Sequence, residues 1–254
     1  DLKNTYEQMT VNPPAGFREI HLFPGVEISV NGGFHLLAIL DKAMATSDID
    51  TLLGTVGYQG TRGDSDGVTR KAAVEVVEAV IKAGGLPIPA HVDGPKGLLQ
   101  IGAAGGAGSA LDANSLRQVF AHGHLLAMEV VDRSAKKPQV YEQAKCGWTE
   151  VLGSDCHGFQ GPASPGSRFT WIKMAHPSLL GLRLALLDGA AFSARRSDES
   201  DDFDPFRMPE HFIKAIEISD ARYMGRGQPA TLAFNPWFNA LVGGRGTGKS
   251  TVIH

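Results

Sequence analysis

The stretch Val26-Glu27-Ile28-Ser29-Val30-Asn31-Gly32-Gly33-Phe34-His35-Leu36-Leu37 places two apolar runs on either side of a glycine turn. We predict a strand over 22–30 and a second over 34–40, because Asn-Gly-Gly between apolar runs is a turn signal. Strand alternation puts Glu27 and Ser29 on one face and Ile28 on the other. A carboxylate on an inward face costs free energy unless it is paired or bound to a metal. The stretch therefore predicts a sheet that carries a polar site.

Outward from this stretch, strand-like runs alternate with helix-period segments as far as about residue 190, which is typical of a parallel α/β architecture. The predicted helices span 1–9, 69–83, 113–121, 139–145 and 178–187, and the further strands span 88–92, 125–131, 149–154 and 169–174. The aspartate-rich segment 195–211 reads as a solvated linker. Two more strands, over 212–219 and 231–242, are expected to open a second domain, so the predicted division is 1–194, 195–211 and 212–254.

The end of the chain, Gly243-Gly244-Arg245-Gly246-Thr247-Gly248-Lys249-Ser250-Thr251, fits the P-loop pattern G-x-x-x-x-G-K-[ST]. In such a loop, backbone N–H groups surround a phosphate, the lysine reaches the outer phosphates and the serine hydroxyl binds Mg²⁺. ATP with Mg²⁺ is the expected ligand. The predicted contacts are Gly243, Gly246, Thr247, Gly248, Lys249, Ser250 and Thr251. Because a P-loop ATPase needs much more chain, and because the sequence starts at Asp1, we expect truncation at both ends.

Polar residues also follow several of the predicted strands. His91 lies at the end of one of these strands. Asp155 and His157 form a D-x-H pair at the end of another strand, and their side chains share one face. Such a pair can hold one metal ion through an oxygen and a nitrogen, and α/β barrels build their sites at these strand ends. His35 is a further candidate. Each histidine taken alone is also compatible with a hydrogen-bonded structural role.

The blocks Phe23–Ile28, His35–Leu37, Ala90-His91 and Gly153–His157 resemble the later motifs of the PHP (polymerase and histidinol phosphatase) family. Together with the P-loop, the chain resembles PHP–ATPase fusions of the TrlF-type AAA-like ATPase family, whose ATPase part is similar to SMC and ABC heads. The resemblance implies a distorted (β/α)₇ TIM-like barrel with its first strand missing. It also implies two or three divalent ions (Zn, Mn or Fe) that hydrolyse phosphoesters. The implied metal ligands are Glu27, His35, His91, Asp155 and His157, with Asp155 and His157 as the catalytic residues.

The family's first motif, an H-x-H, is expected before residue 1, and His122-Gly123-His124 lies at the wrong end of its strand to replace it. We therefore expect weak activity or none from this chain alone. The predicted function of the whole protein is a metal-dependent phosphoesterase, or nuclease, coupled to an SMC/ABC-like ATPase. The alternative is a DNA-associated ATPase clamp or motor whose barrel is a non-catalytic scaffold or sensor.

Composition and charge limit the classes of protein to which this chain can belong. The 254 residues carry a formal net charge of −3 and 43% hydrophobic residues, so a packed core is expected but no overall basic footprint for nucleic acid. The two cysteines indicate no disulfide framework, and no apolar run reaches membrane-spanning length. We expect a cytoplasmic protein that makes no membrane contact and dimerises through its ATPase heads. Its expected substrate is a phosphoester, with DNA and RNA among the candidates.

Overall fold

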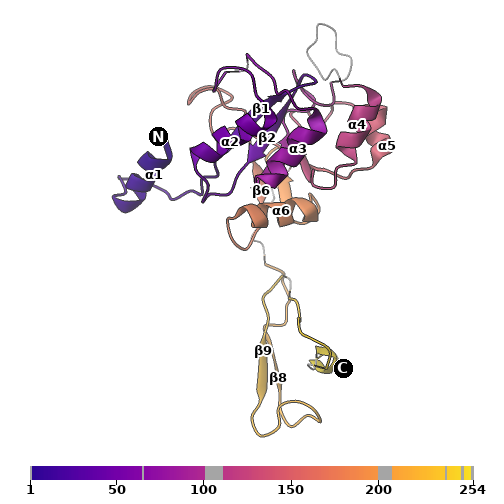
Figure 1. The fold of residues 1–254 in the computed structure, drawn as a ribbon. Helices are drawn as coiled ribbons and strands as arrows, with labels where there is room; N and C mark the ends of the chain where they lie inside the picture. The colour runs from indigo at the N-terminus through magenta and orange to yellow at the C-terminus, as the bar shows by residue number, and fades with distance from the viewer. Residues whose placement is uncertain are drawn as a thin grey trace. The chain divides into compact units, whose positions relative to one another are not determined.

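The computed structural model describes residues 2–64, 66–100, 111–199, 208–237, 239–246 and 249–252. Two compact units divide the chain, Asp1–Asp201 and Asp202–His254. Figure 1 shows the helices and strands of each unit. The first unit is a mixture of helices and small sheets, which confirms the α/β class. No helix among the described residues is long and apolar enough to cross a membrane.

The first sheet has the order β1-β2-β3, with β1 Gly25–Val30, β2 Phe34–Ile39 and β3 Leu86–Pro89. Both pairings are antiparallel, which corrects the expectation of a parallel arrangement here. For β1 and β2 the reason is the short turn, since antiparallel strands can be joined by a few residues whereas parallel strands need a crossover of a dozen or more. Gly32 and Gly33 supply the backbone for this turn, with φ angles of 115° and 80°.

Two further sheets complete the first unit. β4 Ala127–Glu129 pairs with β5 Thr149–Val151 in parallel, and β6 Thr170–Ile172 pairs with β7 Ala194–Arg196 in an antiparallel manner. Hydrogen bonds outside the strands link the sheets: Val92 N–H donates to Glu129 O (2.8 Å), Leu152 N–H donates to Thr170 Oγ1 (2.7 Å), and Thr170 Oγ1 donates to Leu152 O (3.0 Å). None of the sheets formed by the described residues closes into a barrel.

The predicted linker over 195–211 differs at its start from the structure, because Arg195 and Arg196 lie in β7. Arg196 is only 1% exposed. Its Nη1 donates to Val130 O (2.6 Å), and its Nε and Nη2 donate to the Asp198 carboxylate (2.9 and 2.8 Å). A charged residue is buried in this way only when it is paired, so the strand could not be recognised as a core segment from its composition.

Six helices are described: α1 Leu2–Val11, α2 Thr46–Val56, α3 Ala73–Lys82, α4 Ala113–Phe120, α5 Gln139–Ala144 and α6 Leu179–Asp188. The sequence pattern did not predict α2, whose Thr- and Gly-containing sequence has weak helix propensity. The helix ends at Gly57, which adopts a left-handed conformation with φ 64°. The helix predicted over 69–83 begins later, at Ala73, where the Glu75 carboxylate accepts the Ala72 N–H (3.0 Å).

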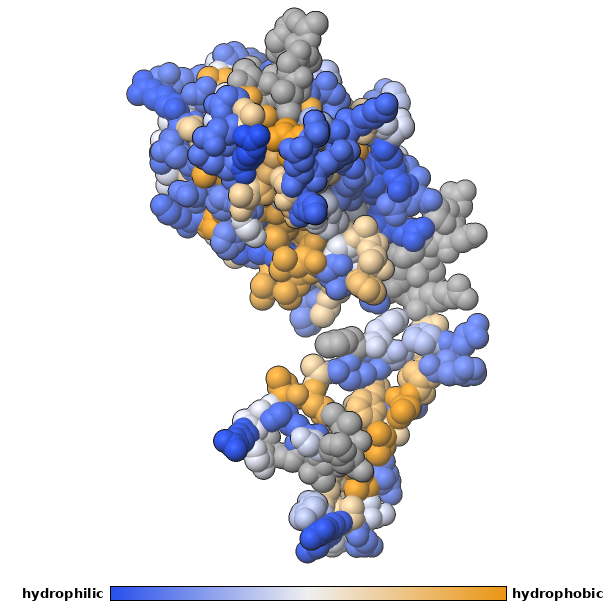
Figure 2. Space-filling view, turned by 90° about the vertical axis from the view of Figure 1, so that its right-hand side faces the viewer, coloured by the Kyte–Doolittle hydropathy of each residue, from blue (hydrophilic) through white to orange (hydrophobic). Residues whose placement is uncertain are grey.

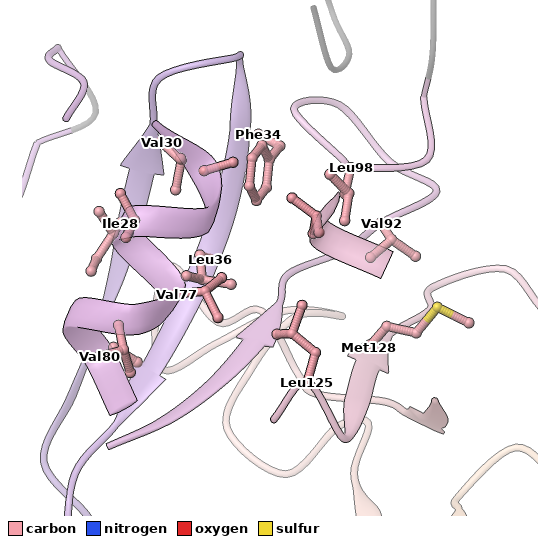
Figure 3. Close-up of a cluster of buried hydrophobic side chains, with 14 of the residues drawn as sticks. Ile28, Val30, Phe34, Leu36, Val77, Val80, Val92, Leu98, Leu125 and Met128 are labelled. Carbon is pink, nitrogen blue, oxygen red and sulfur yellow. The ribbon is translucent and has the colours of Figure 1, made fainter. Parts of the chain in front are cut away.

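Part of the core lies between α3 and the first sheet, as Figure 3 shows. Val77 and Val80 of α3 face Ile28 and Leu36 of β1 and β2, and all four side chains are 0% exposed. Each buried side chain of this size contributes about 1.5–3 kcal/mol through removal from water. Packing on this face is what directs the other face of β1 and β2 toward the polar site.

Exposed apolar side chains interrupt the hydrophilic surface in Figure 2. On α6, Leu179, Ala185 and Leu186 are buried while Leu180, Leu184 and Leu187 are 58–66% exposed. The helix is therefore apolar on both faces.

The second unit contains a two-stranded antiparallel sheet of β8 Ala215–Ile218 and β9 Ala230–Ala233. The strand predicted over 231–242 ends at Ala233, and residues 239–242 before the P-loop are not in a strand. A 3₁₀ helix, η2 Lys249–Val252, follows the loop. An isolated two-stranded sheet is marginally stable in water.

Candidate metal centre

Three side chains that can bind a metal meet on the polar face of the first sheet. In the register of β1 and β2, Ser29 lies opposite His35 and Glu27 lies opposite Leu37. Directly opposite residues share a face, and so do residues two apart on one strand. Glu27, Ser29 and His35 therefore point to the same side, while Ile28 and Leu36 point into the core.

The ligand atoms of Glu27, His35 and His91 lie within 4.8 Å of one another. His35 Nδ1 is 2.5 Å from Glu27 Oε1 and 3.2 Å from His91 Nε2, and His91 Nε2 is 3.7 Å from Glu27 Oε1. The two imidazole side chains are almost buried, with 11% and 12% of their surface exposed, whereas the Glu27 side chain is 36% exposed. The cluster therefore has a buried floor and one side that is open to solvent.

His91 reaches this cluster from the loop after β3. Its φ is 26°, which is uncommon for a residue with a side chain. Its N–H donates to Glu129 Oε2 (3.0 Å), and its buried ring atom Nδ1 has no hydrogen-bond partner. On the other ring, His35 Nε2 is 3.2 Å from Ser29 Oγ. That contact leaves Nδ1 of His35 for the cluster.

Glu27 and His91 shift each other's pKa. Burial acts most strongly on the pKa of Glu27 and opposes ionisation, but His35 and His91 together outweigh it and lower the pKa from 4.5 to about 2. The Glu27 carboxylate raises the pKa of His91 above 6.5, against the effect of burial, and the charges of Glu129 and Asp155 act in the same direction. The ionised Glu27 carboxylate and the protonated His91 ring therefore stabilise each other, so a positive charge is favourable beside Glu27.

Asp155 and His157 form a pair of their own. Asp155 Oδ1 is 3.5 Å from His157 Nε2, and the two side chains are 40% and 88% exposed. Asp155 has a φ of 46°, and the segment before it is held by Arg168 Nη2, which donates to Ser154 O (3.1 Å). Among the described residues, the group of close ligand atoms contains Glu27, His35 and His91 but not this pair. The structure thus brings together three of the five predicted ligands and leaves Asp155 and His157 outside that group.

Sequence reasoning missed two residues around the cluster, Ser29 and Glu129. Ser29 shares a face with Glu27, but a serine in a strand carries no strong signal. Glu129 is a clearer case, because it is a carboxylate in the apolar run Leu125–Val131 and is only 6% exposed. A charged residue inside a predicted buried strand is itself a signal, since such residues are almost never buried unless paired.

The predicted phosphate-binding loop is described in part. Thr247 and Gly248 lie outside the described residues, as does the side chain of Thr251. Lys249 Nζ donates to Gly243 O (2.5 Å) and to Gly244 O (2.6 Å). The ammonium group therefore contacts carbonyls of its own loop.

The chain matches no protein-family model, no curated protein and no solved structure.

Proposed function

We propose that this chain binds a divalent metal ion at Glu27, His35 and His91 and hydrolyses phosphoesters there. The observation that supports the proposal is the convergence of one carboxylate and two imidazoles from three segments of the chain, within 4.8 Å of one another. Two histidines and a glutamate are a donor set used by catalytic zinc sites, which leave a further position open.

The distances fit such an ion. Zinc is bound at about 2.0–2.2 Å by nitrogen and oxygen in a tetrahedron, which separates ligand atoms by about 3.3–3.6 Å. The His35–His91 and His91–Glu27 separations, 3.2 and 3.7 Å, lie close to this range. The Glu27–His35 separation of 2.5 Å is shorter, so the partly exposed Glu27 carboxylate would have to move outward by about 1 Å.

The hydrogen-bonding capacity of the cluster also favours a cation. A ring nitrogen carries either one proton or one lone pair, yet His35 Nδ1 has both Glu27 Oε1 and His91 Nε2 within 3.2 Å. A proton on His35 Nδ1 that is shared with Glu27 is not available to His91 Nε2, whose other neighbour in the cluster is Glu27 Oε1 at 3.7 Å. A cation accepts lone pairs from all three atoms and removes this conflict.

A bound divalent ion supplies Lewis acidity toward a phosphoryl oxygen and lowers the pKa of water. The residues of the chain hold and orient the reacting groups. His35 and His91 form the buried floor of the site, and Glu27 lies on the side that is open to solvent. Asp155 and His157 lie at ion-pair distance from each other and are accessible to solvent, and we assign to them the binding of a further ion or proton transfer to the leaving group. The PHP resemblance supports this assignment, and a PHP-type barrel remains part of the proposal.

The proposal extends to the second unit by its motif. ATP with Mg²⁺ binds at Gly243–Thr251, and nucleotide binding is coupled to the phosphoesterase. A nucleic-acid substrate, pairing of two ATPase heads, and a cytoplasmic location that agrees with the two free cysteines complete the proposed picture.

The test is Mn²⁺- or Zn²⁺-dependent release of p-nitrophenol from bis(p-nitrophenyl) phosphate and from p-nitrophenyl phosphate. We expect slow turnover, because the described cluster supplies ligands for one ion whereas two-metal hydrolysis needs two about 3.5–4 Å apart. Glu27→Gln and Asp155→Asn should each abolish turnover. The control is Glu150→Gln, because Glu150 lies in β5 and its carboxylate pairs with Lys137; this variant should leave turnover unchanged. Turnover that is the same in Glu27→Gln and in the unchanged protein would show that another site, or a contaminant, is responsible.

A second candidate function, a scaffold with a structural metal, is favoured by the exposure of His157 and its separation from the cluster. Stoichiometric metal binding without hydrolysis of either ester would select this candidate over the hydrolase.

A further inference from the structure

Glu129, the last residue of β4, is a buried carboxylate with a main-chain donor on each oxygen. Its Oε2 accepts the N–H of His91 (3.0 Å), and its Oε1 accepts the N–H of Gly153 (3.1 Å). Its own carbonyl oxygen accepts the N–H of Val92 (2.8 Å). One residue is thus hydrogen-bonded to the segment that carries His91 and to the segment that leads to Asp155.

Both of these segments depart from ordinary backbone geometry. His91 has φ 26° and Asp155 has φ 46°. Residues other than glycine keep positive φ angles only where the surrounding structure determines them. One hydrogen bond of the Glu129 carboxylate goes to the N–H of His91, which is itself a residue with positive φ. The other goes to the N–H of Gly153, which lies two residues before Asp155.

Gly153 is matched to this carboxylate. A Cβ atom placed on Gly153 would lie 2.6 Å from Glu129 Oε1, closer than real Cβ contacts allow. Gly153 is not among the residues with positive φ. Glycine is therefore needed at this position because a side chain would block the approach of the Glu129 carboxylate, and not because the backbone requires a positive φ.

We propose that Glu129 is a positioning residue that holds His91 and the Asp155–His157 segment in fixed relative positions through their main chain. This inference rests on the proposed function, because it concerns how the ligands of that site are arranged. A buried carboxylate costs free energy, and two N–H groups on separate loops account for its presence. Glu129 acts through other residues, since the contacts that the structure gives its carboxylate are to main-chain N–H groups.

The test substitutes Glu129→Gln, which keeps the shape but presents an amide NH₂ group to one of the two N–H donors. We expect Zn²⁺ affinity, measured by competition with a chromogenic chelator, to fall about 10- to 100-fold, as for other outer partners of metal ligands. Glu150→Gln is the matched control, because Glu150 lies in the neighbouring strand β5 and pairs with Lys137. Its Zn²⁺ affinity should equal that of the unchanged protein.

A second readout does not depend on metal. In chelator-treated protein, amide hydrogen exchange followed by NMR should show protected N–H groups at His91 and Gly153, and faster exchange at both in Glu129→Gln but not in Glu150→Gln. If Glu129→Gln does not fold, Gly153→Ala displaces the same carboxylate and should give the same pair of results.

The outcomes separate the two proposals. Unchanged exchange at both amides, or unchanged Zn²⁺ affinity in a folded Glu129→Gln variant, would overturn the positioning role and leave the metal site standing. An unchanged protein that binds no Zn²⁺ would overturn the proposed function, and amide exchange would then still decide whether Glu129 holds the two segments together.

Discussion

Replacement of His91 by asparagine offers the most direct measurement of the metal centre. Asparagine removes the imidazole but is one of the few residues that tolerate positive φ, so the φ of 26° at this position can be kept. Alanine would combine loss of the ligand with backbone strain. His91→Asn therefore isolates the contribution of one of three ligand atoms.

The expected size follows from mass action on the first unit, Asp1–Asp201. At a free Zn²⁺ concentration about 100 times the dissociation constant, binding to the native state adds about 2.7 kcal/mol to the free energy of unfolding. For a unit of this size, that raises the Tm by about 5–11 °C. If loss of one ligand weakens affinity about 100-fold, the same Zn²⁺ concentration adds only about 0.4 kcal/mol, or about 1–2 °C.

The assay is thermal unfolding followed by circular dichroism, with each variant compared with its own chelator-treated sample. This reference removes any change in intrinsic stability caused by loss of the His91–Glu27 contact. His124→Asn, in an exposed turn before β4, is the control and should keep the full Zn²⁺ shift. An equal Zn²⁺ shift in His91→Asn and the unchanged protein would refute the three-ligand centre.

Two further predictions concern stability. The pKa of Glu27 is lowered from 4.5 to about 2, so its contribution to the free energy of unfolding is present above pH 4.5 and is lost as the pH falls toward 2. The pKa of His91 is raised, so its contribution is present below pH 6.5 and is lost as the pH rises through the raised value. In metal-free protein, urea unfolding should show the largest destabilisation by Glu27→Gln between pH 4.5 and 6.5, and a difference that instead grows toward pH 9 would contradict the coupling. Arg196→Met should lower the free energy of unfolding by about 1–3 kcal/mol, because it leaves the Val130 carbonyl unpaired while the partly exposed Asp198 can be solvated; an unchanged urea midpoint would show that the buried guanidinium contributes no net stability.

Local pattern was enough to predict most elements of the first unit. The turn at Asn31-Gly32-Gly33 and the stripe of valines in α3 were recognisable because a glycine turn and a 3.6-residue period are properties of neighbouring residues. Element ends were less accurate, and α3 began at Ala73 instead of residue 69. The weak helix former α2 and the polar strand β7 were missed, since tertiary packing stabilises both against their own composition.

For the candidate site, too, some features follow from the sequence and others only from the tertiary structure. The sequence by itself determined which chemical groups are available, Glu27 and His35 on one face of a hairpin and His91 after a strand, because side-chain parity in a strand follows from covalent geometry. Only the tertiary structure decided that these three meet, that Asp155 and His157 stay outside the group, and that Glu129 joins the two segments. Those relations depend on hydrogen bonds between residues 24 to 56 positions apart. Contacts at such separation are set by how sheets and loops pack together, and no local periodicity encodes them.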